Sequence, residues 1–330
     1  MKFLYNVLLA FTLLALSACA ITNSQFVAPS PAPPQGSEIL GVFQGNTPCS
    51  AQARSLPQIP SDTDCDQMIW SLILYRDTAT KRPTTYQLNS AYGVSKQGTN
   101  DLVGGGTAIV MEGKWIVATG IKSDSEATVY QLNPDDPQTT VSFLKVGEDM
   151  LHVLSSDKTL LVGNGAWAYT LNRMDNQKPG QSTVSPDSFP DPPTRPPLPP
   201  MPVGASVFGV FDGRTPCHEL VVEFTKFPTF SGCIKIKMRL TLYQDASTGA
   251  PSTYLLMGTS TYREGTWKIL QGMDGVSTAV IYQLNLDEGQ QPVSFLRMDE
   301  NHLFMLDRNM HLLVGNELFS YTLSRNPDTK

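Results

Sequence analysis

The residues with the most evident capacity for chemistry are the cysteines. The chain of 330 residues has five, and four of them form two pairs with the same internal spacing, Cys49 with Cys65 and Cys217 with Cys233. In an oxidising compartment, each pair is expected to form a disulfide within its own half of the chain. Each bond would close a loop of about 17 residues and contribute on the order of 3 kcal/mol in the chain-entropy model.

A metal site is the alternative reading of the same cysteines. Thiolate ligands of zinc or copper usually come as close pairs, so that one hairpin presents both. Here the spacing is long, and no histidine is repeated beside a cysteine in the two halves. Methionine can also bind Cu(I), but it fills irregular cores well, and the 12 methionines show no close pairing. We therefore expect disulfides, and neither a metal nor another cofactor.

Catalytic patterns are not found in the sequence. It has no Gly-x-Ser-x-Gly, His-Glu-x-x-His, phosphate-binding or dinucleotide-binding motif. The four histidines occupy positions that do not correspond between the two halves, so no duplicated catalytic centre is expected. The net charge of −6 argues against a nucleic-acid partner, which would favour a basic surface. We predict a protein that is not an enzyme and has no catalytic residues.

The start of the chain predicts export. Lys2 is followed by an apolar run over residues 8–16, which is too short to span a bilayer and is typical of a cleaved signal peptide. The run ends in Leu-Ser-Ala-Cys at residues 16–19, which resembles the lipobox of bacterial lipoproteins. We expect a signal peptide over residues 1–18 and acylation, including palmitate, at Cys19, which would anchor the chain to the membrane. An ordinary secretion signal cut beside this cysteine is the alternative.

The remainder of the chain contains two copies of one domain. Residues 41–49 read GVFQGNTPC and residues 209–217 read GVFDGRTPC. The segments YQLN, VSFL, LLVGN and YTL then recur in the same order in both halves. The first copy carries an insertion around residues 89–106, where three consecutive glycines predict an exposed loop. Repeated motifs in register indicate two similar folded units.

Proline-rich segments separate these units. They read APSPAPPQG at residues 28–36 and FPDPPTRPPLPPMP at residues 189–202, sequences that favour extended polyproline II over sheet. The boundaries that follow are a tether over 19–38, a first domain over 39–173, a linker over 174–206 and a second domain over 207–326. At about 3.1 Å per residue, the densest dozen linker residues would hold the domains roughly 40 Å apart.

Within each copy the apolar residues follow the period of two that is typical of strands. About seven to nine short segments of this kind occur per copy, with no long helical pattern. The fold class predicted is all-β, with two tandem small antiparallel barrels. The alternation also runs through AWAYTL at 166–171, which places Trp167 on an inner strand face. The residues expected in the barrel interiors are Trp70, Leu72, Leu74 and Trp115 in the first copy and Met238, Leu240, Leu242 and Trp267 in the second.

Short motifs in both copies resemble the N-terminal domain of the NlpE copper-resistance lipoproteins. In the first copy they are Gly41, Gly45, Pro48 and Cys49, then Leu72 and Leu74, Tyr92 and Gly93, Gly113 and Trp115, Leu151 and Leu154, and YTL at 169–171. In the second copy they are Gly209, Gly213, Pro216 and Cys217, then Leu240 and Leu242, Gly265 and Trp267, Leu303, Leu306 and Asp307, and YTL at 321–323. The resemblance implies a lipocalin-like barrel, an outer-membrane anchor and a role in envelope stress signalling, adhesion or copper tolerance.

One departure from the family concerns copper. The family places a second cysteine three positions after the first, whereas this chain has Gln52 and Leu220 there. The close pair usually associated with copper is therefore missing, and the family fold is a firmer expectation than its metal chemistry.

These observations favour a lipid-anchored envelope protein that presents two barrels to a protein partner in stress sensing or adhesion. Ala20 follows the lipobox cysteine where an aspartate would favour retention, which predicts the outer membrane, facing the periplasm or the cell surface. The alternatives are a carrier that holds a small apolar ligand in the barrel interior, and a copper-tolerance metal binder.

Overall fold

A computed structural model describes residues 32–49, 56–176, 197–217, 233–259, 261–273, 276–285 and 292–328. The predicted signal peptide and Cys19 lie outside these residues, and so does most of the proline-rich linker. Among the residues described, no helix has the length and apolar character needed to cross a membrane.

The first copy forms an eight-stranded barrel. Its strands are β1 (Ser37–Pro48), β2 (Gln67–Asp77), β3 (Pro83–Gly93), β4 (Thr107–Ile121), β5 (Asp124–Leu132), β6 (Val141–Gly147), β7 (Met150–Val153) and β8 (Thr170–Arg173). Each strand pairs antiparallel with the next, and β8 returns to pair with β1, so the sheet closes on itself.

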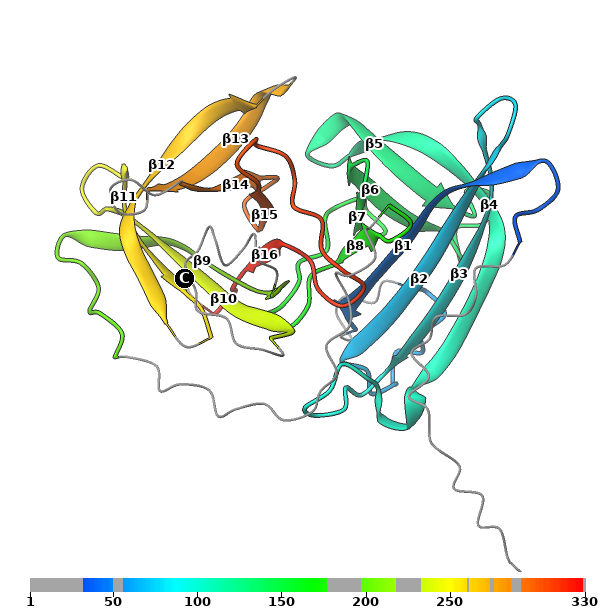
Figure 1. Ribbon diagram of the computed structural model, residues 1–330, viewed down its shortest axis with the longest axis horizontal. Coiled ribbons are helices and arrows are strands. Elements are labelled where there is room, and N and C mark those ends of the chain that lie inside the picture. Colours follow the sequence, from blue (N-terminus) through cyan, green and yellow to red (C-terminus); the bar gives the residue numbers. More distant parts are fainter. Residues whose placement is uncertain are drawn as a thin grey trace, which may run out of the picture.

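The second copy repeats this order. Its strands are β9 (Ala205–Pro216), β10 (Lys235–Asp245), β11 (Pro251–Met257), β12 (Tyr262–Met273), β13 (Val276–Asn285), β14 (Val293–Arg297), β15 (His302–Leu306) and β16 (Thr322–Arg325). Closure is made by β16 pairing with β9. The prediction of an all-β fold with two tandem antiparallel barrels is confirmed (Figure 1). The up-and-down strand order is that of lipocalin barrels.

The interiors are filled by the side chains that the period-two pattern points inward. All eight residues predicted for the interiors belong to the two main cores, and none is more than 3% exposed. A solvent-filled lumen lined by these residues would leave their side chains accessible from inside the barrel. Both interiors are therefore packed with side chains at these positions.

One tryptophan closes an equivalent place in each barrel. The Trp115 indole N–H donates to the Tyr75 carbonyl at 2.8 Å, and Trp267 donates to the Tyr243 carbonyl at 2.6 Å. A glycine two residues earlier lets the neighbouring chain approach, since a Cβ at Gly265 would lie 2.5 Å from a backbone oxygen. Each tryptophan thus has a hydrogen-bond acceptor for its indole N–H and space for its ring at the barrel wall.

The insertion of the first copy is partly strand and partly loop. Residues 89–93 continue β3, and the loop begins after them and runs to the start of β4. It contains the short 3₁₀ turn η1 (Val103–Gly105) and three exposed glycines with positive φ, Gly104, Gly105 and Gly106. The expectation of an exposed glycine loop holds for this part of the insertion.

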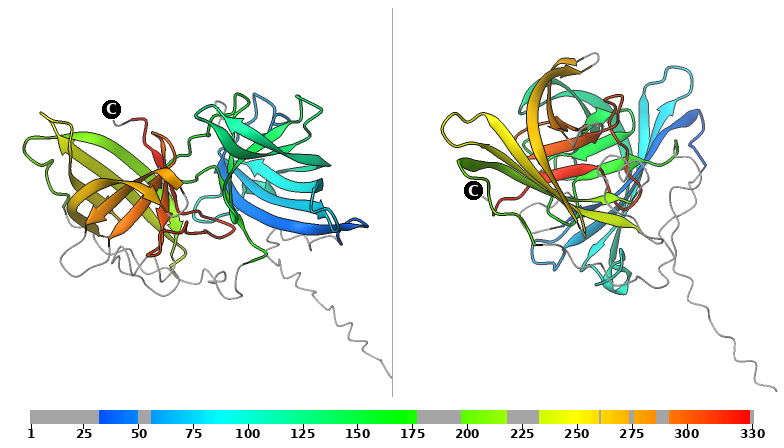
Figure 2. Two further views of the ribbon diagram at one scale, coloured as in Figure 1. Left: turned by 90° about the horizontal axis from the view of Figure 1, so that it is seen from above. Right: turned by 60° about the vertical axis from the view of Figure 1, so that its left-hand side comes forward.

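The expected separation of the domains is wrong, because the barrels contact each other directly. Thr170 on β8 lies 3.0 Å from Thr322 on β16, measured between their hydroxyl oxygens. Figures 1 and 2 show β7 and β8 facing β15 and β16 between the two barrels. The reach of an extended linker sets only an upper limit on a distance, and here the outer faces of these strands are apolar enough to pack together.

The alternation through residues 166–171 also misplaces one residue. β8 begins only at Thr170, and Trp167 lies in the loop before it, partly exposed. Asn164 accounts for this, because its side-chain oxygen accepts from the backbone N–H groups of Ala166 and Trp167 and holds a turn there.

Candidate functional site

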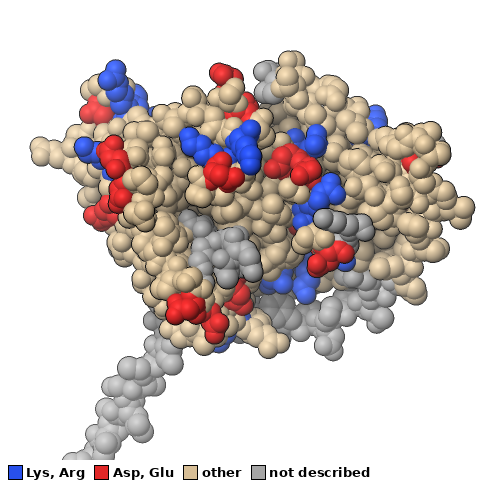
Figure 3. Space-filling view, turned by 180° about the vertical axis from the view of Figure 1, so that it is seen from behind, with Lys and Arg blue, Asp and Glu red and all other residues tan. Residues whose placement is uncertain are grey.

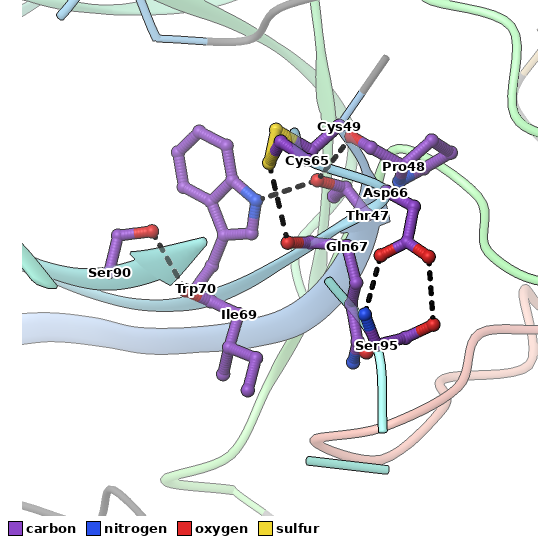
Figure 4. The surroundings of a disulfide bond; sticks show 10 residues. All are labelled: Thr47, Pro48, Cys49, Cys65, Asp66, Gln67, Ile69, Trp70, Ser90 and Ser95. Carbon is purple, nitrogen blue, oxygen red and sulfur yellow. Dashed lines mark hydrogen bonds between the residues drawn. A yellow bond between two sulfur atoms is a disulfide. The ribbon is translucent and has the colours of Figure 1, made fainter. Parts of the chain in front are cut away.

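The four predicted disulfide cysteines pair as expected. Cys49 bonds to Cys65 and Cys217 bonds to Cys233, with Cα atoms 5.3 and 5.7 Å apart. Each bond links the end of the first strand of a barrel to the residues just before the second strand. Figure 4 shows the first bond beside the buried ring of Trp70.

Around this first disulfide, Trp70 and Asp66 make side-chain hydrogen bonds, whereas the buried side-chain oxygen of Gln67 has no hydrogen-bond partner among the described residues. The Trp70 indole N–H donates to the Thr47 hydroxyl at 2.9 Å, and the carboxylate of Asp66 accepts from the backbone N–H and the hydroxyl of Ser95 (Figure 4). In the second barrel Met238 stands where the first has Trp70. The buried hydroxyl of Thr215, the counterpart of Thr47, has no hydrogen-bond partner among the described residues.

The feature that only the folded chain reveals is the contact between the barrels, which we call the inter-barrel seam. It is formed by the outer faces of β7 and β8 against those of β15 and β16 and the loops before β8 and β16. Asn172 on β8 is fully buried there and bonds three times to the second barrel. Its side-chain oxygen accepts from the Gly315 N–H at 2.9 Å, and its amide donates to the carbonyls of Asn316 and Phe319 at 2.9 and 3.3 Å.

The seam has an approximate twofold symmetry. Thr170 and Thr322, which bond to each other, are the threonines of the two YTL motifs. The approach of Asn172 to Gly315 also has its counterpart, since a Cβ added at Gly163 would meet the Ser324 hydroxyl at 2.7 Å. Equivalent positions of the two copies thus face one another, as in the isologous interface of a homodimer.

Apolar side chains extend the seam on both sides of this polar centre. Met150 of the first barrel belongs to a cluster with Ile281, Phe304 and Leu306 of the second. Met298 of the second barrel packs in turn against a cluster of the first barrel, whose buried members are Ile121, Val129, Leu144, Leu154 and Leu160. Burial of such surface stabilises the contact by about 25 cal/mol per Å².

Two histidines meet in the seam. The rings of His152 and His302 are both fully buried, with centroids 4.8 Å apart. Both Nε2 atoms face one carbonyl oxygen, that of Leu161, at 3.0 and 3.1 Å. A carbonyl only accepts, so each ring carries a proton on Nε2.

The other nitrogens of the two rings differ in their surroundings. His152 Nδ1 lies 3.2 Å from the Thr170 hydroxyl, which can donate to it, so this ring makes both contacts when neutral. His302 Nδ1 lies 2.8 Å from the Asp299 carboxylate, an acceptor, so this ring makes both bonds only with two protons. Burial, together with the neighbouring His302, lowers the pKa of His152 from 6.5 to about 3.

Two hollows occur in the described surface. A cavity of about 210 Å³ at the edge of the seam is lined by Leu144 and Lys145 of the first barrel and Met298 of the second, among others. Another, of about 500 Å³, lies between linker prolines 199, 200 and 202 and the wall of the second barrel. The described residues contain no group of three or more His, Cys, Asp or Glu side chains placed to hold a metal ion.

Sequence reasoning missed the histidine pair, although both residues are plainly visible in the sequence. His152 corresponds to Phe304 in the repeat, and His302 corresponds to Met150, so neither histidine has a histidine partner in register. In the structure the His152 ring contacts the rings of both His302 and Phe304, and the centroid of the Phe304 ring lies 6.0 Å from that of His152. The period-two pattern points His152 and His302 outward on strands whose other outward-facing residues are apolar. An apolar outer face of this kind is the sequence feature that could have indicated a buried contact there.

Comparisons of the chain with family models, with curated proteins and with solved structures find no match.

Proposed function

We propose that this protein is a lipid-anchored envelope lipoprotein that presents its paired barrels to a protein partner, in the manner of a sensor or adhesion module. The lipobox-like residues 16–19 support the anchor. Two intact disulfides agree with an oxidising compartment. The resemblance to NlpE lipoproteins points to envelope stress or adhesion as the setting.

The observation that carries the contact role is the filling of both interiors. With the predicted interior side chains buried and packed, the outer walls away from the seam and the loops are the surfaces left for recognition. That favours a protein surface as the ligand over a small apolar molecule held inside a barrel. The exposed loop of residues 94–106 distinguishes the first barrel from the second and is a natural contact region.

The anchor is tested by metabolic labelling with an alkyne palmitate analogue in a diderm bacterial host. We expect the wild type to incorporate label and to fractionate with the outer membrane, and Cys19→Ala to lose both properties. A double variant, Cys49→Ala with Cys65→Ala, serves as the control and should keep the label, because it retains Cys19 and removes only two disulfide-bonded cysteines. Label that persists in Cys19→Ala would contradict the proposal.

The partner is tested in the same cells with a photo-crosslinking residue at Val103, which is 58% exposed in the loop of the first barrel. We expect a discrete adduct that depends on anchoring and is lost in Cys19→Ala. The same probe at Val207, 42% exposed on the second barrel, distinguishes contact by the loop from contact along the whole molecule. The absence of any adduct from either position would count against a protein partner.

A further inference from the structure

The outer face of β9 and β10 carries four cations in neighbouring positions. Lys235, Lys237 and Arg239 alternate outward along β10, and Arg214 projects from β9 directly opposite Lys237 in the register. Arg239 is neutralised by Asp212, with two nitrogen–oxygen contacts of 2.6 and 2.7 Å. The other three form no ion pair with any carboxylate among the described residues.

This arrangement is unfavourable in the absence of an anion. Like charges directly opposite each other on paired strands are destabilising. The cost is raised by burial, because the Nε atom of Arg214 is shielded from solvent and has no hydrogen-bond partner within the described part of the chain. Burial lowers the pKa of Lys235, and the charges of Arg214 and Lys237 lower it further, while burial lowers the pKa of Arg214.

Aromatic rings from both barrels border two of the three cations, Arg214 and Lys235. The Arg214 guanidinium lies 5.8 Å from the centre of the Trp167 ring, which belongs to the first barrel. The Lys235 ammonium lies 5.3 Å from the centre of the Phe319 ring. The cluster therefore sits at the edge of the inter-barrel seam, partly walled by rings, and not on an open, fully solvated surface.

The first copy lacks this cluster at the same strand positions. Asn46 corresponds to Arg214, Gln67 to Lys235 and Ile69 to Lys237, so all three positions are neutral there. The shared fold thus has no need of the charges. Charged residues make up only 16% of the chain, and much of the face drawn in Figure 3 is uncharged. Three neighbouring cations without a carboxylate partner among the described residues are therefore unusual for this protein.

We propose that Arg214, Lys235 and Lys237 bind a phosphate group at the edge of the seam. Three positive charges match a phosphate dianion better than a single carboxylate, and a guanidinium with two ammonium groups supplies several donors to its oxygens. The phosphate could belong to a free ion or soluble compound or to a lipid headgroup. This site goes beyond the proposed function, because neither the anchor nor a protein partner enters its derivation.

The test uses residues 20–330 exported behind a fully cleaved secretion signal, which gives both disulfides and no acyl chain. Inorganic phosphate is titrated by calorimetry at constant chloride, and the melting temperature is followed in parallel. The variants are Arg214→Asn, Lys235→Gln and Lys237→Ile, each of which installs the residue that the first barrel tolerates at that position. The control is Lys268→Gln, an exposed lysine on β12.

We expect saturable binding of phosphate by the wild type, at least tenfold weaker binding in Arg214→Asn, Lys235→Gln and Lys237→Ile, and binding by Lys268→Gln within twofold of the wild type. Phosphate should raise the melting temperature of the wild type but not that of Lys235→Gln. The same variants without phosphate should melt at or above the wild-type temperature, because the repulsion is removed. No saturable binding, or equal binding in all variants, would overturn the site.

Two further arms distinguish the sources of the anion. In the first arm, the protein is mixed with vesicles of phosphatidylglycerol or of phosphatidylcholine. Binding to the phosphatidylglycerol vesicles alone, with displacement by free phosphate, would assign the site to a lipid headgroup. Phosphate binding without vesicle binding would assign it to a soluble phosphate. Binding of poly-glutamate in the absence of phosphate binding would refute the proposal in favour of an acidic protein segment.

Discussion

At the scale of single residues, the environment of His152 determines the protonation state of its ring. The ring is fully buried in the seam, between the Thr170 hydroxyl, the Leu161 carbonyl and the His302 ring, with the Asp299 carboxylate on the far side of His302. These contacts suit a neutral ring. The pKa of His152 falls to about 3 through burial first and the charge of His302 second.

This lowered pKa makes the stability of the protein sensitive to acid. The folded chain keeps His152 neutral, whereas the unfolded chain protonates it below its ordinary pKa of 6.5. The stabilisation is therefore complete above pH 6.5 and is lost as the pH falls from 6.5 towards about 3, by at most about 1.4 kcal/mol per pH unit.

We predict that His152→Phe, which installs the residue of the second copy, flattens this dependence. Urea unfolding at pH 7, 6, 5 and 4 measures it, and the wild-type midpoint should fall more steeply than that of the variant. The control is His311→Asn, which removes a histidine whose side chain is 76% exposed. Parallel slopes in wild type and His152→Phe would refute the assignment.

At the scale of elements, the two copies solve the same packing problem with different residues. The β1–β2 pair buries Trp70 with its N–H bonded to Thr47. The β9–β10 pair has Met238 at that place and leaves the Thr215 hydroxyl buried and unbonded within the described structure. The threonine that accepts a hydrogen bond from Trp70 in the first barrel is thus kept in the second barrel as Thr215, where the tryptophan is missing.

The same substitution should have opposite consequences in the two copies. Thr47→Val leaves a buried indole N–H without an acceptor and should cost about 1–3 kcal/mol of unfolding free energy. Thr215→Val removes an unbonded hydroxyl at nearly constant shape and should be neutral or stabilising. Thermal and urea unfolding of the two variants against the wild type measures both. Equal destabilisation by the two substitutions would contradict the hydrogen-bond argument.

At the scale of the whole molecule, the seam turns two domains into one unit. Three hydrogen bonds converge on Asn172, the threonines of the two copies bond to each other, and apolar clusters flank them on both sides. Because equivalent residues face one another, the chain has the character of a dimer whose subunits are joined by a linker. The linker then acts by raising the local concentration of one barrel around the other.

We predict that cutting the linker does not separate the barrels. A protease site inserted between residues 186 and 196 should yield two fragments that co-elute in size-exclusion chromatography. Asn172→Ala leaves buried partners in the seam unsatisfied, at a cost of about 1–3 kcal/mol, and should weaken association of the cut fragments roughly tenfold to a hundredfold.

Gln87→Ala is the matched control for that experiment. Its side-chain bond goes to Glu112 on the neighbouring strand, so it lies within the first barrel and should leave association intact. Fragments that separate on cleavage of the otherwise unaltered chain would show that the seam does not hold the barrels together.

The sequence by itself determined the repeat, the strand-rich fold and the disulfide pairing. These follow from local patterns: a period of two fixes which side of a strand faces inward, and equal cysteine spacing in two copies fixes a common loop. Trp70, Leu72, Met238 and Leu240 could be placed inside for this reason. Trp167 could not, because the turn set by Asn164 interrupts an alternation that otherwise continues.

Only the tertiary structure decided how the barrels meet. His152, His302, Asn172 and Arg214 each lie on an outer face, where the period-two pattern predicts solvent, and their partners lie in the other copy. The histidines are not equivalent in the repeat, and the cations have no counterparts in the first copy. Contacts between distant segments depend on how the two closed sheets are placed relative to each other. The free energy of packing determines that placement, and a local period in the sequence contains no information about it.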